Sequence, residues 1–219
     1  MAEQPGYTFR EELSLNPIRP GTAVLVAGPR HDGSRELVLT MTADGTDEGM
    51  IVVTTNAGAR RVVEDCERLG AQFDPEHAGI VDCVGEEPPD PFPARVLTVS
   101  SPRDLTGIGI RYSQLHGDLH AEGIDRVRSG VVSVSTLLSL GDLQQVSRFV
   151  HTLAGRITAV DGIDIFHIDP TIHDERTVNT LAQFCDGRID VRDRGEGTEL
   201  RARGLPDQSR EWRSVDLPF

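Results

Sequence analysis

The sequence predicts an α/β protein in which a mainly parallel central sheet carries helices on both faces and a β-hairpin closes the chain. Strand-like runs alternate with helical periodicity from residue 21 to about residue 185, as in parallel strands joined by crossover helices. Two further strand-like runs flank the turn at 195–197. At 219 residues the chain has the length of one large domain, and we expect residues 1–219 to form it.

The first half of the chain is expected to supply four strands and three helices. The strands are expected at residues 21–28, 50–56, 79–84 and 95–100. The first helix covers 36–43, the second ends near residue 69, and the third begins after a cap at Asp104 or Thr106. Residues 86–93 are acidic and rich in proline, so they are predicted to form a loop.

The second half continues the same alternation. The apolar run 131–138 is expected to be a fully buried strand, and Asp142 is expected to begin a helix with a wide apolar face. A strand at 164–168 and a helix at about 174–185 follow. The hairpin pairs the sequences GRIDVRDR and TELRARGL.

The composition indicates a protein that folds in water and stays in the cytoplasm. No apolar run reaches the roughly 18 residues that a membrane-spanning helix requires. The N-terminus lacks the basic and apolar regions of a signal peptide. Cys66, Cys83 and Cys185 are far apart in the sequence, so we expect neither a disulfide framework nor a thiolate metal site.

All 22 basic residues are arginine, and the net charge is −13. A chain of ordinary composition would carry on the order of ten or more lysines. Complete replacement of lysine together with a dense carboxylate surface is the pattern of a salt-adapted proteome, so our hypothesis is the cytoplasm of a halophilic archaeon. Codon bias alone is the alternative explanation. The negative charge argues against a general attraction to nucleic acid or anionic membranes.

The segment after the first predicted strand has the glycine spacing of a phosphate-binding loop. Gly28 and Gly33 match the two glycines of the Walker A pattern G-x-x-x-x-G-K-[ST]. Ser34 stands where the lysine contacts the β- and γ-phosphates, and Arg35 stands where a hydroxyl binds Mg²⁺. The candidate loop consists of Gly28, Pro29, Arg30, His31, Asp32, Gly33, Ser34 and Arg35.

Longer strings resemble the KaiC-like branch of the RecA superfamily, especially its haloarchaeal members. These strings are IRPGTAVLVAGP (18–29), SSPRDLTGIGI (100–110), SVSTLLSLGDLQQVSRFVHTLAGR (133–156), IDPTIHDERTVNTLAQFCDGRIDVR (168–192) and LRARGLPDQSREW (200–212). The resemblance implies the three-layer RecA/KaiC-like fold of P-loop NTPases. It also implies ATP at the carboxyl ends of the strands, often shared between neighbouring subunits of a ring or filament.

The same resemblance implies acidic residues that this chain lacks. Relatives that hydrolyse ATP carry a glutamate that activates water at the end of the second strand, where Thr55 and Asn56 stand. Asparagine cannot act as a base at neutral pH. Val132 stands where relatives carry an aspartate that organises the metal. These positions, together with Ser34 and Arg35, predict a degenerate Walker A loop in a pseudo-ATPase without a cofactor.

Retained nucleotide binding is the alternative. Backbone N–H groups at the helix start and a nearby guanidinium, from Arg30 or Arg35, are groups that bind phosphate, whereas Asp32 repels it. In that case ATP is the cofactor, and the chain is a nucleotide-binding sensor or a weak ATPase. If no nucleotide binds, the loop serves only to form the turn between the first strand and the first helix.

Two other clusters qualify as sites. His116 and His120 have the i, i+4 spacing of two metal ligands, but no third ligand has obvious spacing, which favours boundary histidines. The hairpin concentrates positive charge that would dock an acidic partner or an adjacent subunit, or would instead form a solvated face of cross-strand ion pairs. Its arginines are Arg188, Arg192, Arg201 and Arg203, which alternate with Asp190 and Glu199.

We therefore expect a catalytically inactive RecA/KaiC-like domain without a bound metal. Its expected role is regulation or assembly, through a protein partner or through self-association. A nucleic-acid role would rest only on analogy of fold with recombinases, and a shared fold does not establish a function.

Overall fold

The computed structural model describes residues 4–29, 31, 33–45, 47–71, 74–85, 91–195 and 197–216. The strands are β1 (Thr22–Ala27), β2 (Gly49–Thr54), β3 (Ala78–Asp82), β4 (Arg95–Thr98), β5 (Val127–Val132), β6 (Ile163–Ile168), β7 (Gly187–Asp193), β8 (Thr198–Arg203) and β9 (Arg213–Val215). The α-helices are α1 (Ser34–Thr42), α2 (Ala59–Arg68), α3 (Leu105–Ala121), α4 (Val134–Leu140), α5 (Leu143–Ala159) and α6 (Glu175–Ala182). Among the described residues, short 3₁₀ helices cover Glu11–Leu13 and Pro75–His77.

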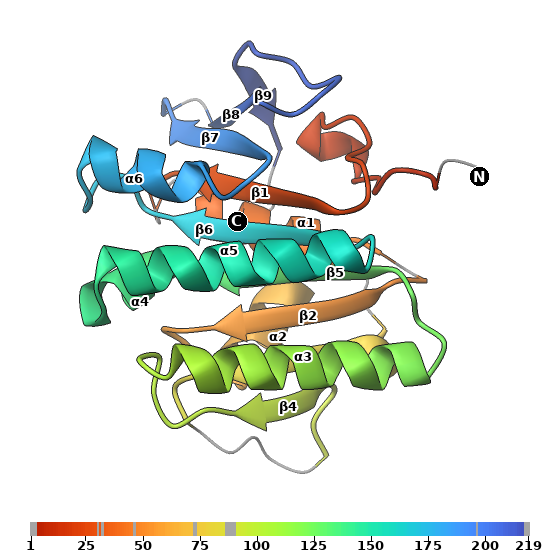
Figure 1. The fold of residues 1–219 in the computed structure, drawn as a ribbon. Coiled ribbons are helices and arrows are strands. Elements are labelled where there is room, and N and C mark those ends of the chain that lie inside the picture. Colours follow the sequence, from red (N-terminus) through yellow and green to blue (C-terminus); the bar gives the residue numbers. More distant parts are fainter. Residues whose placement is uncertain are drawn as a thin grey trace.

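The strands form one nine-stranded sheet in the order β4-β3-β2-β5-β6-β1-β7-β8-β9 (Figure 1). All pairings among β1 to β7 are parallel, whereas β8 pairs antiparallel with both β7 and β9. The prediction of a mainly parallel sheet with a C-terminal hairpin is therefore confirmed. Because parallel strands share one direction, the carboxyl ends of β1, β2, β5 and β6 lie along the same edge of the sheet.

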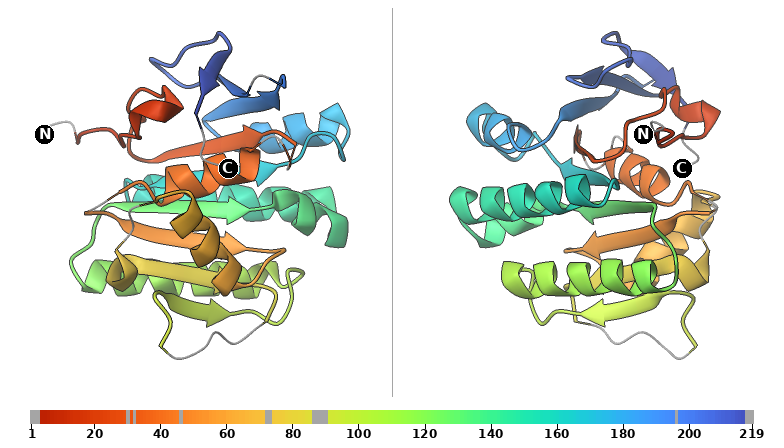
Figure 2. Two further views of the ribbon diagram at one scale, coloured as in Figure 1. Left: turned by 180° about the vertical axis from the view of Figure 1, so that it is seen from behind. Right: turned by 45° about the vertical axis from the view of Figure 1, so that its right-hand side comes forward.

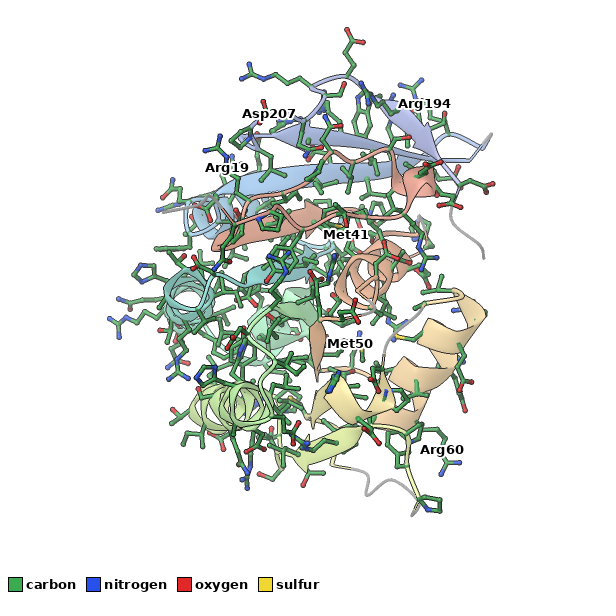
Figure 3. The ribbon with its side chains drawn as sticks, turned by 90° about the vertical axis from the view of Figure 1, so that its right-hand side faces the viewer. Arg19, Met41, Met50, Arg60, Arg194 and Asp207 are labelled. Atoms are coloured by element: carbon green, nitrogen blue, oxygen red, sulfur yellow. The ribbon has the colours of Figure 1, made fainter. Side chains whose placement is uncertain are left out.

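Helices cover both faces of the sheet. α3 and α5 lie on one face, and α1 and α2 lie on the other, as the view from behind shows (Figures 1 and 2). Each face has its own buried apolar cluster. Met41 of α1 and Met50 of β2 lie in the interior between α1, α2 and the sheet, whereas Arg60 and Arg194 lie at the periphery (Figure 3). Within the described residues, none of the helices combines the length and apolar character needed to cross a membrane.

Helix caps follow the sequence signals. The side chains of Asp104, Asp142 and Asp174 each accept a hydrogen bond from a backbone N–H in the first turn of α3, α5 and α6. Such caps satisfy donors that the helix leaves unpaired. Asp104, and not Thr106, is thus the cap of α3.

The predicted strand at 131–138 is wrong. The strand β5 ends at Val132, and the apolar residues that follow form α4, whose N-cap Ser133 has a φ of 80° and accepts a hydrogen bond from the Thr136 N–H. A short apolar run does not distinguish a buried strand from a buried helix. The beginning of β5 was missed because Arg128 and Ser129 make it look polar, although both are buried. The strand β9 was also not predicted, and residues 86–90 of the predicted loop lie outside the described residues.

Candidate functional site

The glycine loop joins β1 to α1 at the carboxyl edge of the sheet. Gly33 is the N-cap of α1 and has a φ of 80°, a conformation that glycine adopts without strain. A β-carbon on Gly28 would lie 2.7 Å from the β-carbon of Val191 and 2.9 Å from that of Ser34. The positive φ of Gly33 and the close packing around Gly28 therefore explain why glycine stands at these two positions. His31 is exposed, and the predicted loop residues Arg30 and Asp32 lie outside the described residues.

Ser34, at the lysine position of the loop pattern, is completely buried. Its Oγ lies 2.7 Å from the Pro29 carbonyl oxygen and 3.0 Å from that of Gly28. The same Oγ lies 2.9 Å from Nε2 of His167, a buried residue of β6. A hydroxyl has one proton, so it donates to the loop carbonyls and can accept a hydrogen bond from His167 when Nε2 carries the ring proton.

The side chain of Arg35 points to α2. Its guanidinium is buried and forms an ion pair with the buried carboxylate of Asp65. The Asp65 carboxylate also forms ion pairs with the guanidinium groups of Arg68 at 2.9 Å and Arg61 at 3.1 Å. Arg35 thus connects α1 to α2 beneath the loop, instead of facing the position where the KaiC-like resemblance would place a metal.

The neighbouring strand ends carry no free carboxylate at the two acidic positions that the resemblance implies. The Thr55 hydroxyl lies 2.9 Å from the backbone oxygens of both Val132 and Ser133, which ties the end of β2 to the end of β5. Val132 is fully buried. The carboxylate of Asp82, at the end of β3, accepts hydrogen bonds from the N–H groups of Ala59 and Val84, both at 2.7 Å. Within the described residues, no three His, Cys, Asp or Glu side chains are grouped so that they could hold a metal ion.

A buried polar cluster lies between α3 and the sheet. The Tyr112 hydroxyl donates to Asp164 at 2.7 Å and lies 2.9 Å from the Ser129 hydroxyl, which also contacts Asp164. Burial raises the pKa of Asp164 to about 7, against the opposing effect of the hydrogen bonds from Ser129 and Tyr112. No local sequence pattern marks this cluster, because Tyr112, Ser129 and Asp164 come from three separate elements of the chain.

The two histidines of α3 have separate surroundings. His120 is exposed, and its Nδ1 lies 2.8 Å from the carboxylate of Asp125. The ring of His116 packs edge-on against Tyr112 with centroids 4.7 Å apart. Burial, reinforced by the charge of Arg156, lowers the pKa of His116 to about 4. This arrangement favours the interpretation of boundary histidines over a shared metal.

The arginines of the hairpin share one face, and each is paired within the chain. Asp190 receives three guanidinium groups, from Arg188 at 2.6 Å, Arg203 at 2.8 Å and Arg201 at 3.1 Å. Arg192 pairs with Glu199 at 2.8 Å. Trp212 packs against the guanidinium groups of Arg192 and Arg201, at 3.8 and 4.5 Å from its ring centroid. Four arginines face two carboxylates, so this hairpin face keeps a net positive charge.

The three cysteines are free thiols. Burial raises the pKa of Cys66, Cys83 and Cys185 to about 12 in each case. Because the thiolate is the nucleophile and the metal ligand, these groups are poorly suited to either role.

The sheet order and the helices on both faces are those of the KaiC-like RecA fold. The structure is similar to the crystal structure of the KaiC-like protein PH0186 from the hyperthermophilic archaeon Pyrococcus horikoshii OT3, with a TM-score of 0.65. The two chains are 16% identical, and the alignment covers 96% of this chain and 92% of PH0186. Identity at this level shows the fold alone.

The chain belongs to the family of unknown function DUF7504, which matches residues 21–191. That match spans the sheet from β1 to the middle of β7 and includes the whole glycine loop. No curated protein matches the chain significantly.

Proposed function

We propose that this chain is a KaiC-like domain that has lost ATP hydrolysis and acts as a regulatory or assembly module by binding a protein partner or further copies of itself. The observation that carries the proposal is the Ser34 side chain. It is buried inside the loop, and its hydroxyl is engaged by the Gly28 and Pro29 carbonyls and by His167. A lysine in this position would contact the phosphates.

The residues present do not fit Mg²⁺-ATP in the arrangement that the resemblance implies. The position that supplies a hydroxyl to Mg²⁺ is occupied by Arg35, which pairs with Asp65, and the Ser34 hydroxyl is engaged by loop carbonyls and by His167. Thr55 and Asn56 stand where the glutamate is implied, and Val132 stands where the aspartate is implied. The Thr55 hydroxyl is bonded to backbone carbonyls. Hydrolysis needs groups that hold the metal and orient water at the γ-phosphate. The missing groups belong to three separate places, the glycine loop and the ends of β2 and β5. This supports the proposal that ATP hydrolysis has been lost altogether.

We further propose that the protein works in the cytoplasm of a halophilic archaeon as one domain. The support is compositional: all basic residues are arginine, and the net charge is −13. The charged hairpin face is one surface that a partner would meet.

The proposal is tested by ATP turnover and by thermal melting of the purified chain in KCl-rich buffer with Mg²⁺. We expect no turnover above background and no rise in melting temperature with ATP, since a ligand of the native state would raise it. Saturable turnover that is lost in a folded Gly33→Ala variant would refute the proposal. A rise in melting temperature without turnover would instead favour the nucleotide-binding sensor.

The variant Ser34→Lys tests whether the loop can bind ATP, independently of the acidic groups that hydrolysis also needs. Arg35 is left in place because it holds Asp65. We expect this variant to gain affinity for ATP, seen as a rise in melting temperature. It should remain without turnover because Asn56 and Val132 still supply no carboxylate. If Ser34→Lys folds and binds no ATP, the loop has diverged in shape as well as in side chains.

A further inference from the structure

A groove of about 540 Å³ lies between the first turns of α3 and the middle of α5. These helices lie on the same face of the sheet (Figure 1). Its lining combines apolar and basic side chains, including Leu105, Ile110, Phe149, Arg103, Arg148 and Arg156.

The apolar part of the groove reaches the surface. Ile110 is 59% exposed, although most large apolar side chains of the described residues are buried. Phe149 and Leu153 lie below it with little exposure and form the floor. An exposed apolar side chain above an apolar floor offers area that a partner would bury, at roughly 25 cal/mol per Å².

The groove is basic on a strongly acidic chain. Arg103 and Arg148 are exposed, and neither guanidinium forms an ion pair with any of the described residues, unlike the arginines of the hairpin. Arg156 reaches across the groove and donates to the Gly109 carbonyl at 3.2 Å. The one carboxylate in the lining, Asp104, is engaged in capping α3 through the Gly107 N–H at 2.8 Å. The groove therefore presents unpaired positive charge.

Gly109 lines the groove from the first turns of α3. A glycine inside a helix destabilises it by roughly 0.5–1 kcal/mol relative to alanine. A β-carbon at Gly109 would meet no atom within 4 Å, so nothing in the chain requires glycine there. Because Gly109 lines the groove, a side chain at this position would project into free space that a partner would occupy.

We propose that this groove binds an acidic amphipathic segment of a partner protein, with an apolar side chain of the segment packed on Ile110 and Phe149 and carboxylates paired with Arg103 and Arg148. This inference rests on the proposed function as a protein-binding module, and it names the surface and the chemistry of the partner. Charge complementarity favours an acidic partner at this groove. A chain of net charge −13 repels acidic partners over most of its surface, so association is favoured where unpaired arginines gather. Helical segments that lay an apolar face into a groove are a recurring mode of peptide recognition.

The test uses a fluorescent helical peptide of about 16 residues, with leucine and phenylalanine on one face and aspartate and glutamate on the other. Binding is followed by anisotropy at the lowest KCl concentration that keeps the chain folded. We expect saturable binding that weakens by about tenfold or more in Arg103→Glu/Arg148→Glu and in Gly109→Met. The matched control is Gly155→Met on α5, which also has free space at its β-carbon but does not line the groove. It should bind like the parent chain.

Three outcomes would overturn the inference. The first is no saturable binding, or equal binding of a peptide whose carboxylates are replaced by amides. The second is self-association in sedimentation that Gly109→Met abolishes, which would make a second copy the occupant. The third is tighter binding of a single-stranded oligonucleotide at the same arginines. ATP turnover is measured separately, so its appearance would refute the proposed function without affecting the peptide result.

Discussion

At the scale of single residues, Arg35 shows how a loop position has taken a structural role. Its guanidinium is buried against Asp65, and both groups are removed from water. A buried ion pair contributes little net stability, but removal of one partner leaves a buried charge without compensation. Arg61 and Arg68 supply part of that compensation to Asp65 from the surface.

We predict that Arg35→Thr lowers the free energy of unfolding by about 2–4 kcal/mol, at the lower end of the range for broken buried pairs because Asp65 keeps two other arginines. The double variant Arg35→Met/Asp65→Leu should recover most of the loss, because no buried charge remains. Chemical denaturation of the three proteins measures both effects. An Arg35→Thr chain as stable as the parent would contradict the assigned role.

Two titratable groups near α3, the buried Asp164 and the partly buried His116, have opposite effects on the pH dependence of stability. The native state holds the Asp164 proton up to a pH of about 7, whereas the unfolded chain releases it near its usual pKa of 3.8. Stability therefore falls as the pH rises between these values. His116 acts in reverse, because between pH 4 and 6.5 the unfolded chain binds a proton that the native state does not, so stability rises with pH.

We predict opposite pH profiles for two variants, each compared with the parent chain by denaturation from pH 4 to 8. Asp164→Asn should become more stable relative to the parent as the pH rises toward 7, and His116→Leu should become less stable toward 6.5. Each slope approaches about 1.4 kcal/mol per pH unit where the group is charged in only one of the two states. Parallel profiles for all three proteins would show that neither group titrates as described.

At the scale of elements, the C-terminal hairpin depends on one carboxylate. Asp190 is buried beneath three arginines from two strands, which joins β7 to β8 through side chains as well as through the backbone ladder. Glu199 pairs with a single arginine and is more exposed.

We predict that Asp190→Asn lowers the free energy of unfolding by about 1–3 kcal/mol, since three guanidinium groups lose their shared counter-charge. The loss should shrink in concentrated KCl, which screens the repulsion among the arginines. The matched variant Glu199→Gln should change stability by less than about 1 kcal/mol, as expected for a single pair that is partly open to solvent. Melting curves of both variants at two salt concentrations measure these losses of stability. Equal losses in Asp190→Asn and Glu199→Gln would contradict a central role for Asp190.

At the scale of the whole molecule, net charge governs the response to salt. A surface with net charge −13 repels itself, and the Debye length falls from about 30 Å at 0.01 M salt to about 3 Å at 1 M. We predict a steep rise in melting temperature from dilute buffer to molar KCl. Sucrose at matched osmolality is the control, because it favours burial without screening charge. A flat profile in KCl would leave codon bias as the explanation of the composition.

The order of strands and helices could be predicted from the sequence because it depends on local patterns. Aspartates before apolar helical runs marked the starts of α3, α5 and α6, and their side chains do cap those helices. The resemblance to KaiC-like proteins agrees with the fold of PH0186. Local patterns failed at residues 131–138, where a run of apolar residues fits a strand and a helix equally well.

The absence of lysine and the residues at each loop position were determined by the sequence alone, since they do not depend on how the chain folds. Only the tertiary structure decided what those residues touch. Ser34 meets His167 from 133 positions away, Asp164 meets Tyr112 across 52, and the groove joins two helices that the sequence separates by a strand and a helix. A contact between distant positions depends on strand order and helix placement, and local propensity carries no information about either.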